Sequence, residues 1–162
     1  MPVRPISIEL QPRDFALLRE LLESRVMTLA HATSLHFGGR RVVAKKRVAK
    51  LKDAGLIVER PRRQFDPSVL FLTRQAFQLL RDRGHCADYP ALGVSAMEKR
   101  SRVSDLKLRH ELAVMDIKVA VAKAIAERPT LSFRCFSTWP RLYEFWASTV
   151  MDGFQTGLAA RG

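Results

Sequence analysis

The segment from Gly38 to Thr73 constrains the fold of this chain most, because a basic helical stretch, a glycine stop and a hairpin pattern follow one another within it. It reads GGRRVVAKKRVAKLKDAGLIVERPRRQFDPSVLFLT. Residues 38–83 hold 13 Lys and Arg side chains against 4 acidic ones, so +9 of the net charge of +12 falls in this part. A helix and a hairpin that share a strong positive field suit the backbone of a nucleic acid.

The size and composition of the chain favour one domain with its own core. The sequence has 162 residues, of which 47% are hydrophobic. Cys86 and Cys135 fit no metal-ligand spacing and indicate no disulfide framework, which suits the reducing cytosol. Charged residues interrupt the apolar residues at the start, and no stretch reaches the roughly 20 apolar residues of a membrane span. We therefore expect a cytoplasmic protein with a polyanionic partner.

Apolar residues at helical spacing predict three helices before the hairpin. The first covers residues 12–24, and the second follows an N-cap at Thr28. The third covers residues 40–54 and stops at Gly55, a typical helix C-terminal signal. These signals predict a compact set of three helices at the start of the chain.

The predicted third helix has one apolar side and one basic side. At 100° per residue, Ala44, Val48 and Leu51 share a side, which we expect to pack on the first two helices. The opposite side and one flank should face outward, and they carry Arg41, Lys45, Lys46, Ala49, Lys50 and Asp53.

Apolar and β-branched residues over 56–60 and 68–72 predict the two strands of a hairpin. Residues 61–67 contain turn formers, among them Asp66-Pro67. Thr73 then predicts the cap of a fourth helix.

Three parts of the chain differ in pattern. We expect a first domain over residues 1–84, a linker or loop over 85–104, and a helical extension over 105–162. In the extension, apolar spacings of four and three predict a long helix over 105–127, and alternation favours a strand over 130–138. The predicted fold class is therefore mainly α with a small β-hairpin, plus a long C-terminal helix.

Three helices followed by a basic hairpin resemble a winged helix-turn-helix, in which the second helix of the pair enters the major groove of DNA. The resemblance implies contacts from the third helix and the hairpin tip, although the third helix could also be no more than a solvated face. Base reading would come from Arg40, Arg41, Lys45 and Ala49. Phosphate contacts would come from Lys46, Lys50, Arg62 and Arg63, and the helix N-terminus at Thr28 would offer amides to a phosphate.

Four segments also resemble the replication-relaxation family of plasmid and mobile-element proteins. They are QPRD at 11–14, RVAKLKDAGLI at 47–57, LFLT at 70–73 and LRHELAVMD at 108–116. The resemblance implies a DNA-binding winged helix and a use in replication control. MarR-like and PadR-like repressors share many of the same helix-end and turn signals, so they remain alternative relatives.

Catalysis is the first rival to DNA binding. Longer members of the family continue to a Pro-Asp-Gly step and a later acidic pair that resemble a nuclease, whereas this sequence has Asp152 after Met151 and no later acids. The sets His110, Glu111 and Asp116, and His31 with His36, lack metal-ligand spacing and are expected to be ordinary helical residues. Cys86 lacks a motif partner, and no Gly-rich nucleotide loop is present.

We therefore expect a sequence-specific double-stranded DNA-binding protein, without enzymatic activity, cofactor or metal, that regulates transcription or controls replication. A truncated nuclease-like protein and a winged-helix protein-interaction module are the alternatives, and a membrane-surface role is disfavoured.

The long helix predicted over 105–127 has two interpretations. Its apolar stripe could pack back on the first helix, or it could pair with its copy in a homodimer. The stripe consists of Leu108, Leu112, Met115, Val119 and Ala122, and it is widened by Leu106, Ala113, Ile117, Val121 and Ala124. We expect the homodimer, which would place two DNA-binding units on two half-sites.

Overall fold

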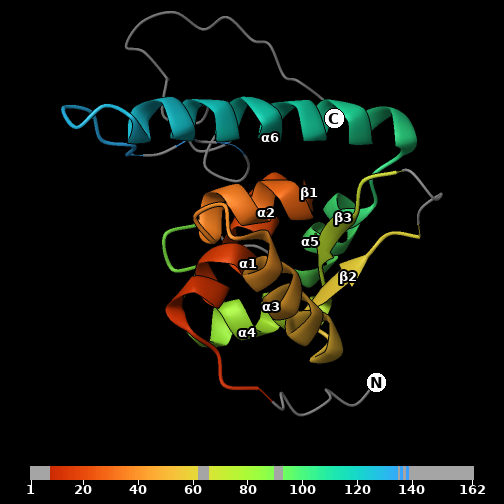
Figure 1. The fold of residues 1–162 in the computed structure, drawn as a ribbon. Coiled ribbons are helices and arrows are strands. Elements are labelled where there is room, and N and C mark those ends of the chain that lie inside the picture. Colours follow the sequence, from red (N-terminus) through yellow and green to blue (C-terminus); the bar gives the residue numbers. More distant parts are fainter. Residues whose placement is uncertain (1–7, 62–65, 90–92, 135, 137, 139–162) are drawn as a thin grey trace, which may run out of the picture.

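The structure of the chain is a computed structural model that describes residues 8–61, 66–89, 93–134, 136 and 138 (Figure 1). Its elements are α1 (Pro12–Ser24), β1 (Met27–Thr28), α2 (Leu29–His36), α3 (Arg41–Asp53), β2 (Ile57–Glu59), β3 (Val69–Leu72), α4 (Arg74–Asp82), α5 (Val94–Ser101) and α6 (Asp105–Ala126). The predicted class, mainly α with a small β-hairpin, is confirmed.

Local signals in the sequence set the ends of the first helices. Gln11 caps α1 in a capping box with Asp14, and Pro12 occupies the first turn, where its missing N–H costs nothing. Thr28 caps α2, because its hydroxyl accepts a hydrogen bond from the His31 amide at 3.1 Å. Gly55, at φ +71°, ends α3 in a left-handed conformation that other residues rarely adopt.

The three strands form one small antiparallel sheet in the order β1-β3-β2. In this sheet Ile57 pairs with Leu72 in the predicted hairpin, and Met27 pairs with Leu70 on the other edge of β3. The sequence did not indicate β1, because a two-residue strand carries no alternating pattern. The strand links the start of α2 to the hairpin, so the sheet and the first helices share one core.

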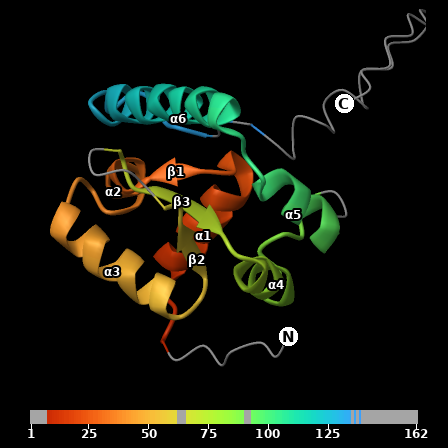
Figure 2. The same cartoon turned by 90° about the vertical axis from the view of Figure 1, so that its right-hand side faces the viewer.

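The hydrophobic core surrounds α1, which lies between the sheet, α2 and α4 (Figures 1 and 2). Four leucines of α1 are buried at helical spacing, namely Leu17, Leu18, Leu21 and Leu22. Ala44, Val48 and Leu51 of α3 join the same core, as predicted, and α3 contacts α2 and β2. Burial of one side of α3 fixes which of its other residues face outward.

The segment that we expected to be a linker or loop, residues 85–104, contains the helix α5. This helix packs against α4 and buries Met97, its one buried side chain. A helix held by a single deep side chain shows almost no apolar periodicity in sequence. Its formation therefore depends on the tertiary contact with α4 rather than on its own pattern.

The helix α6 lies across α2 and β1, on the side of α2 that is opposite α3 (Figures 1 and 2). Its predicted apolar stripe turns toward the protein body and buries Met115. Its contacts are mainly with α2 and β1 rather than with the first helix, whose packing was the alternative to the expected homodimer. The residues that widen the stripe remain exposed, namely Leu106, Ala113, Ile117, Val121 and Ala124.

Three polar pairs add to the apolar contact of α6. Glu111 accepts a hydrogen bond from Arg25 at 2.7 Å, and Lys118 donates one to Glu20 at 2.7 Å. The third pair joins His31 Nε2 and Asp116 Oδ1 at 2.8 Å. The pairs reach α6 from α1, from α2 and from the turn after α1, so they fix both its position and its rotation.

The strand expected over residues 130–138 is absent from the described part of that segment, residues 130–134, 136 and 138. The central strand β3 is already paired with β1 on one edge and with β2 on the other, so it has no free edge for a further strand. Thr138 instead donates a side-chain hydrogen bond to the Glu23 carbonyl at 3.2 Å. Within the described residues, no helix has the length and hydropathy that crossing a bilayer requires.

Candidate nucleic-acid interface

The outward side of α3 carries the residues that the helical spacing placed there. Ala44, Val48 and Leu51 anchor the opposite side in the core. The exposed residues of α3, which we call its outer face, are Arg41, Val42, Val43, Lys45, Lys46, Ala49, Lys50 and Asp53. Arg40 stands just before the helix as its N-cap residue and is also exposed.

The basic residues of α3 divide into two groups by their partners. Arg47 forms an ion pair with Asp14, and Lys52 forms one with Glu59 of β2. The side chains of Arg41 and of the three lysines of the outer face have no hydrogen bond or ion pair with any residue that the structure describes. These four cationic side chains are therefore available to a ligand, and Asp53 is the one acidic side chain that α3 exposes beside them.

A groove of about 380 Å³ runs between α3 and the start of α1. Its lining, which we call the basic groove, is Gln11, Arg13, Phe37, Arg40, Val43, Lys46, Arg47 and Lys50. The Arg13 guanidinium lies over the Phe37 ring, 5.3 Å from its centroid. Arg40 Nε donates to the Phe37 carbonyl at 3.3 Å, which leaves its terminal nitrogens for another acceptor. The groove and the outer face share Val43, Lys46 and Lys50.

A buried ion pair builds the basic groove. Asp14 is only 1% exposed, and its Oδ1 accepts a hydrogen bond from Arg47 Nε at 2.8 Å. Arg47 also donates to the Glu9 carbonyl at 2.7 Å. The hydrogen bond to Asp14 raises the pKa of Arg47, so this guanidinium stays charged. The pair holds the start of α1 against α3, which is why Gln11 and Arg13 line the groove.

The sequence pattern did not indicate that Gln11 and Arg13 line a groove with α3. Asp14 and Arg47 are separated by 33 positions, and no spacing rule links a residue in the first turn of one helix to the middle of another. The signal that was available was Asp14 itself, an acid near a strongly basic segment. An acid in that place also has a purely local explanation, as a favourable charge at a helix N-terminus.

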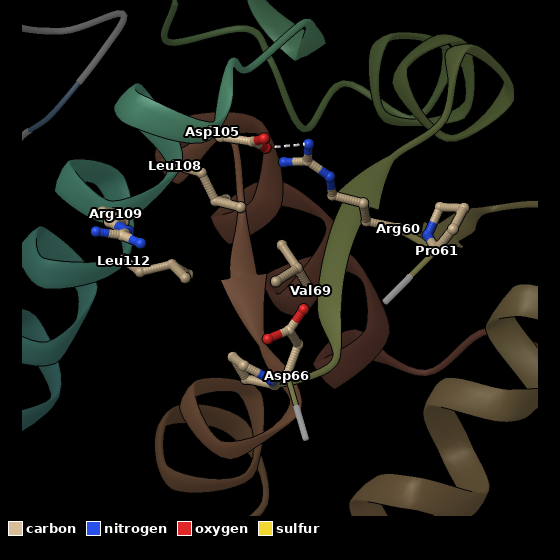
Figure 3. A pocket seen from close by; sticks show the side chains of 9 residues that line it. Arg60, Pro61, Asp66, Val69, Asp105, Leu108, Arg109 and Leu112 are labelled. Carbon is tan, nitrogen blue, oxygen red and sulfur yellow. Dashed lines mark hydrogen bonds and ion pairs between the residues drawn. The ribbon is translucent and has the colours of Figure 1, made fainter. Parts of the chain in front are cut away.

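The base of the hairpin is attached to α6 rather than free. Arg60 pairs with Asp105 at the start of α6, and a cavity of about 620 Å³ lies between the two elements (Figure 3). Val69, Leu108 and Leu112 supply the apolar part of its lining. The Arg60 side chain therefore has a structural role, which is to hold the hairpin against α6. Arg62 and Arg63, the predicted contacts at the hairpin tip, lie outside the described residues.

Two of the first three amides of α2 are already hydrogen-bonded, which weakens the expectation of a phosphate site at Thr28. The Leu29 amide donates to the Ser68 carbonyl at 3.2 Å, and the His31 amide donates to the Thr28 hydroxyl. Thr28 is itself buried. These amides serve the contact between α2 and the hairpin, so a phosphate would have to displace existing bonds.

Two of the acidic groups considered for metal chemistry have structural roles. Glu111 and Asp116 hold α6 in place through Arg25 and His31, while His110 is exposed. No cluster of three metal-ligating side chains occurs in the described part of the chain. Burial raises the pKa of the Cys86 thiol, the opposite of what a reactive thiolate needs. Asp152 lies outside the described residues.

The chain was compared with protein-family models, curated proteins and solved structures. The family model described as replication-relaxation matches residues 18–150. No curated protein and no solved structure matches the chain. The family match spans most of the chain, from α1 through the outer face of α3 to beyond α6. The chain therefore belongs to the replication-relaxation family.

Proposed function

We propose that the elements α1 to β3 act as a winged helix-turn-helix and that the chain binds double-stranded DNA in a sequence-specific way. The observation that supports this most is the outer face of α3, where Arg41, Lys45, Lys46 and Lys50 have no partner among the described residues. Uncompensated cations on one helix face, beside a basic groove, are suited to phosphate and base contacts. Family membership points to a replication-related function.

The proposed roles follow the position of each residue on α3. Arg40, Arg41 and Lys45 stand near the helix N-terminus, the part of a recognition helix that contacts base edges, and Ala49 continues the same face. Lys46 and Lys50 line the basic groove and would hold phosphates, together with Arg13. Arg62 and Arg63 remain proposed phosphate contacts from the hairpin tip. The chain would act by occupying a site, in replication control or transcription regulation, without catalysis or a cofactor.

We further propose that two copies act together. The side of α6 that faces away from α2 is apolar and exposed, with Ile117 near its middle at 57% exposure. A helix that is packed on one face normally carries polar residues on the other. Pairing through this face would let two α3 helices address half-sites about one DNA turn apart.

Binding of short duplexes, measured by fluorescence anisotropy over a range of salt concentrations, tests the proposal. A specific duplex comes from selection on a randomised library, and an unrelated duplex of equal length serves as the reference. Lys50→Ala should weaken binding to both duplexes and lower the salt slope by about one, because one phosphate contact is lost. Arg41→Ala should weaken only the specific duplex, by about 1–3 kcal/mol.

Lys123→Ala is the matched control, since it removes one exposed lysine from α6, far from α3. It should leave both affinities nearly unchanged, whereas a loss equal to that of Lys50→Ala would mean that only net charge matters. Absence of any salt-sensitive DNA binding by the native protein would contradict the proposal and favour a protein-interaction module. Magnesium-dependent nicking that Asp152→Asn abolishes would favour the nuclease-like alternative.

A further inference from the structure

Two valines stand on the exposed side of the first turn of α3. Val42 is 68% exposed and Val43 is 42% exposed, and they directly follow Arg40 and Arg41. Neither belongs to the core, which α3 enters through Ala44, Val48 and Leu51. The first turn of α3 therefore shows two branched apolar side chains to solvent in the middle of a basic surface.

The fold gives no reason for these valines. Valine loses side-chain freedom in a helix, so at an exposed position it stabilises the helix less than alanine or lysine would. Val42 lies on the same side of α3 as Lys46 and Ala49, at the centre of the outer face. Val43 lines the basic groove beside Phe37. Their position on the face indicates that a ligand, rather than the core, covers them.

The charges around the valines restrict what that ligand can be. Arg41, Lys45 and Lys46 surround the two side chains and have no acidic partner among the described residues. An apolar protein surface would have to desolvate these cations without compensation. The major groove of DNA supplies anionic phosphates for the cations and one apolar group on base edges, the C5-methyl group of thymine.

We propose that Val42 contacts the C5-methyl group of a thymine and that Val43 covers the same methyl group from the side of the basic groove. The DNA site would then contain an A·T pair where the first turn of α3 enters the major groove. This inference rests on the proposed function. It makes Val42 a specificity residue, because the thymine methyl is the only apolar feature that distinguishes A·T from the other base pairs in that groove.

Replacement of thymine by deoxyuridine tests the contact directly, because it removes one methyl group and keeps every hydrogen-bonding atom. Each thymine of a duplex selected from a randomised library is replaced in turn, and the affinity of the native protein is compared with that of Val42→Ala. The native protein should lose about fourfold in affinity at one position of each half-site, the worth of one buried methyl group. Val42→Ala should bind thymine and deoxyuridine equally at that position.

Leu131→Ala is the matched control, because Leu131 is a branched apolar residue, 49% exposed, that follows α6 in the chain and belongs neither to α3 nor to the apolar side of α6. It should keep the full sensitivity to deoxyuridine. Val42→Ala should unfold at a temperature no lower than that of the native protein, because alanine favours the helix, and this excludes misfolding as the cause.

The outcomes separate this inference from the proposed function. Specific binding that is insensitive to deoxyuridine at every position would overturn the role of Val42 while the proposed function stands. The role of Val42 is likewise overturned if Val42→Ala keeps the native sensitivity. Binding that shows no preference for any duplex would overturn sequence-specific recognition itself, and the inference with it.

Discussion

Acid should destabilise this protein through His36, the last residue of α2. Its Nε2 is buried and has no hydrogen-bond partner within the described residues. Burial, with a smaller contribution from the charge of Lys118 on α6, lowers the pKa of this imidazole from 6.5 to about 4. Lys118 is itself held in place by Glu20 of α1. The folded protein therefore disfavours the protonated form of His36, which the unfolded chain accepts readily.

The size of the effect follows from the two pKa values. A histidine whose pKa is lower in the folded state contributes stability above the unfolded value of 6.5, and this contribution is lost as the pH falls toward 4. Each pKa unit corresponds to about 1.4 kcal/mol, so the whole effect is about 3 kcal/mol. Near pH 4.5, about 2.5 kcal/mol of it should already be lost.

Urea unfolding at about pH 7 and about pH 4.5 measures this loss. The neutral variant His36→Gln should lose about 2.5 kcal/mol less than the native protein between the two pH values. His110→Gln, which removes an exposed histidine of α6, should behave like the native protein. The reasoning is refuted if His36→Gln is as sensitive to acid as the native protein, because the loss would then arise at other groups.

Two further predictions concern the ion pair of the basic groove and the outer side of α6. Asp14→Ala should lower the free energy of unfolding in urea by about 3 kcal/mol, because the partly buried Arg47 loses its partner, and the double variant with Arg47→Ala should cost less than the sum of the single ones. Strict additivity would mean that the two side chains act independently. In sedimentation equilibrium at micromolar concentration, the native protein should have the mass of a dimer and Ile117→Lys that of a monomer. A monomeric native protein would remove the proposed pairing of two copies.

Much of the fold was predictable because strong local signals mark its elements. Pro12 and Gly55 set ends of α1 and α3, and the spacing of Ala44, Val48 and Leu51 set the rotation of α3. The outer face of α3 followed from that rotation alone. These features depend on residues within a few helical turns, which is the range over which sequence patterns are informative.

The features that the sequence did not predict depend on contacts between distant segments. The strand β1 exists because β3 has an edge to pair with, and α5 exists because Met97 finds a site against α4. The basic groove exists because Asp14 and Arg47 bring two helices together across 33 positions. None of these three pairings can be predicted from the spacing of residues in the sequence, because each depends on how the whole chain folds.

The arrangement of the sheet also affects the tendency of the protein to aggregate at high concentration. The longest strand, β3, is the central one, and its two neighbours are only two and three residues long. One of these short edges, β1, is flanked by α6. Edges of this length offer too few free amides and carbonyls to recruit a strand from another molecule. The folded state thus has built-in protection against aggregation by strand addition, which would otherwise threaten a chain with an apolar, β-branched hairpin.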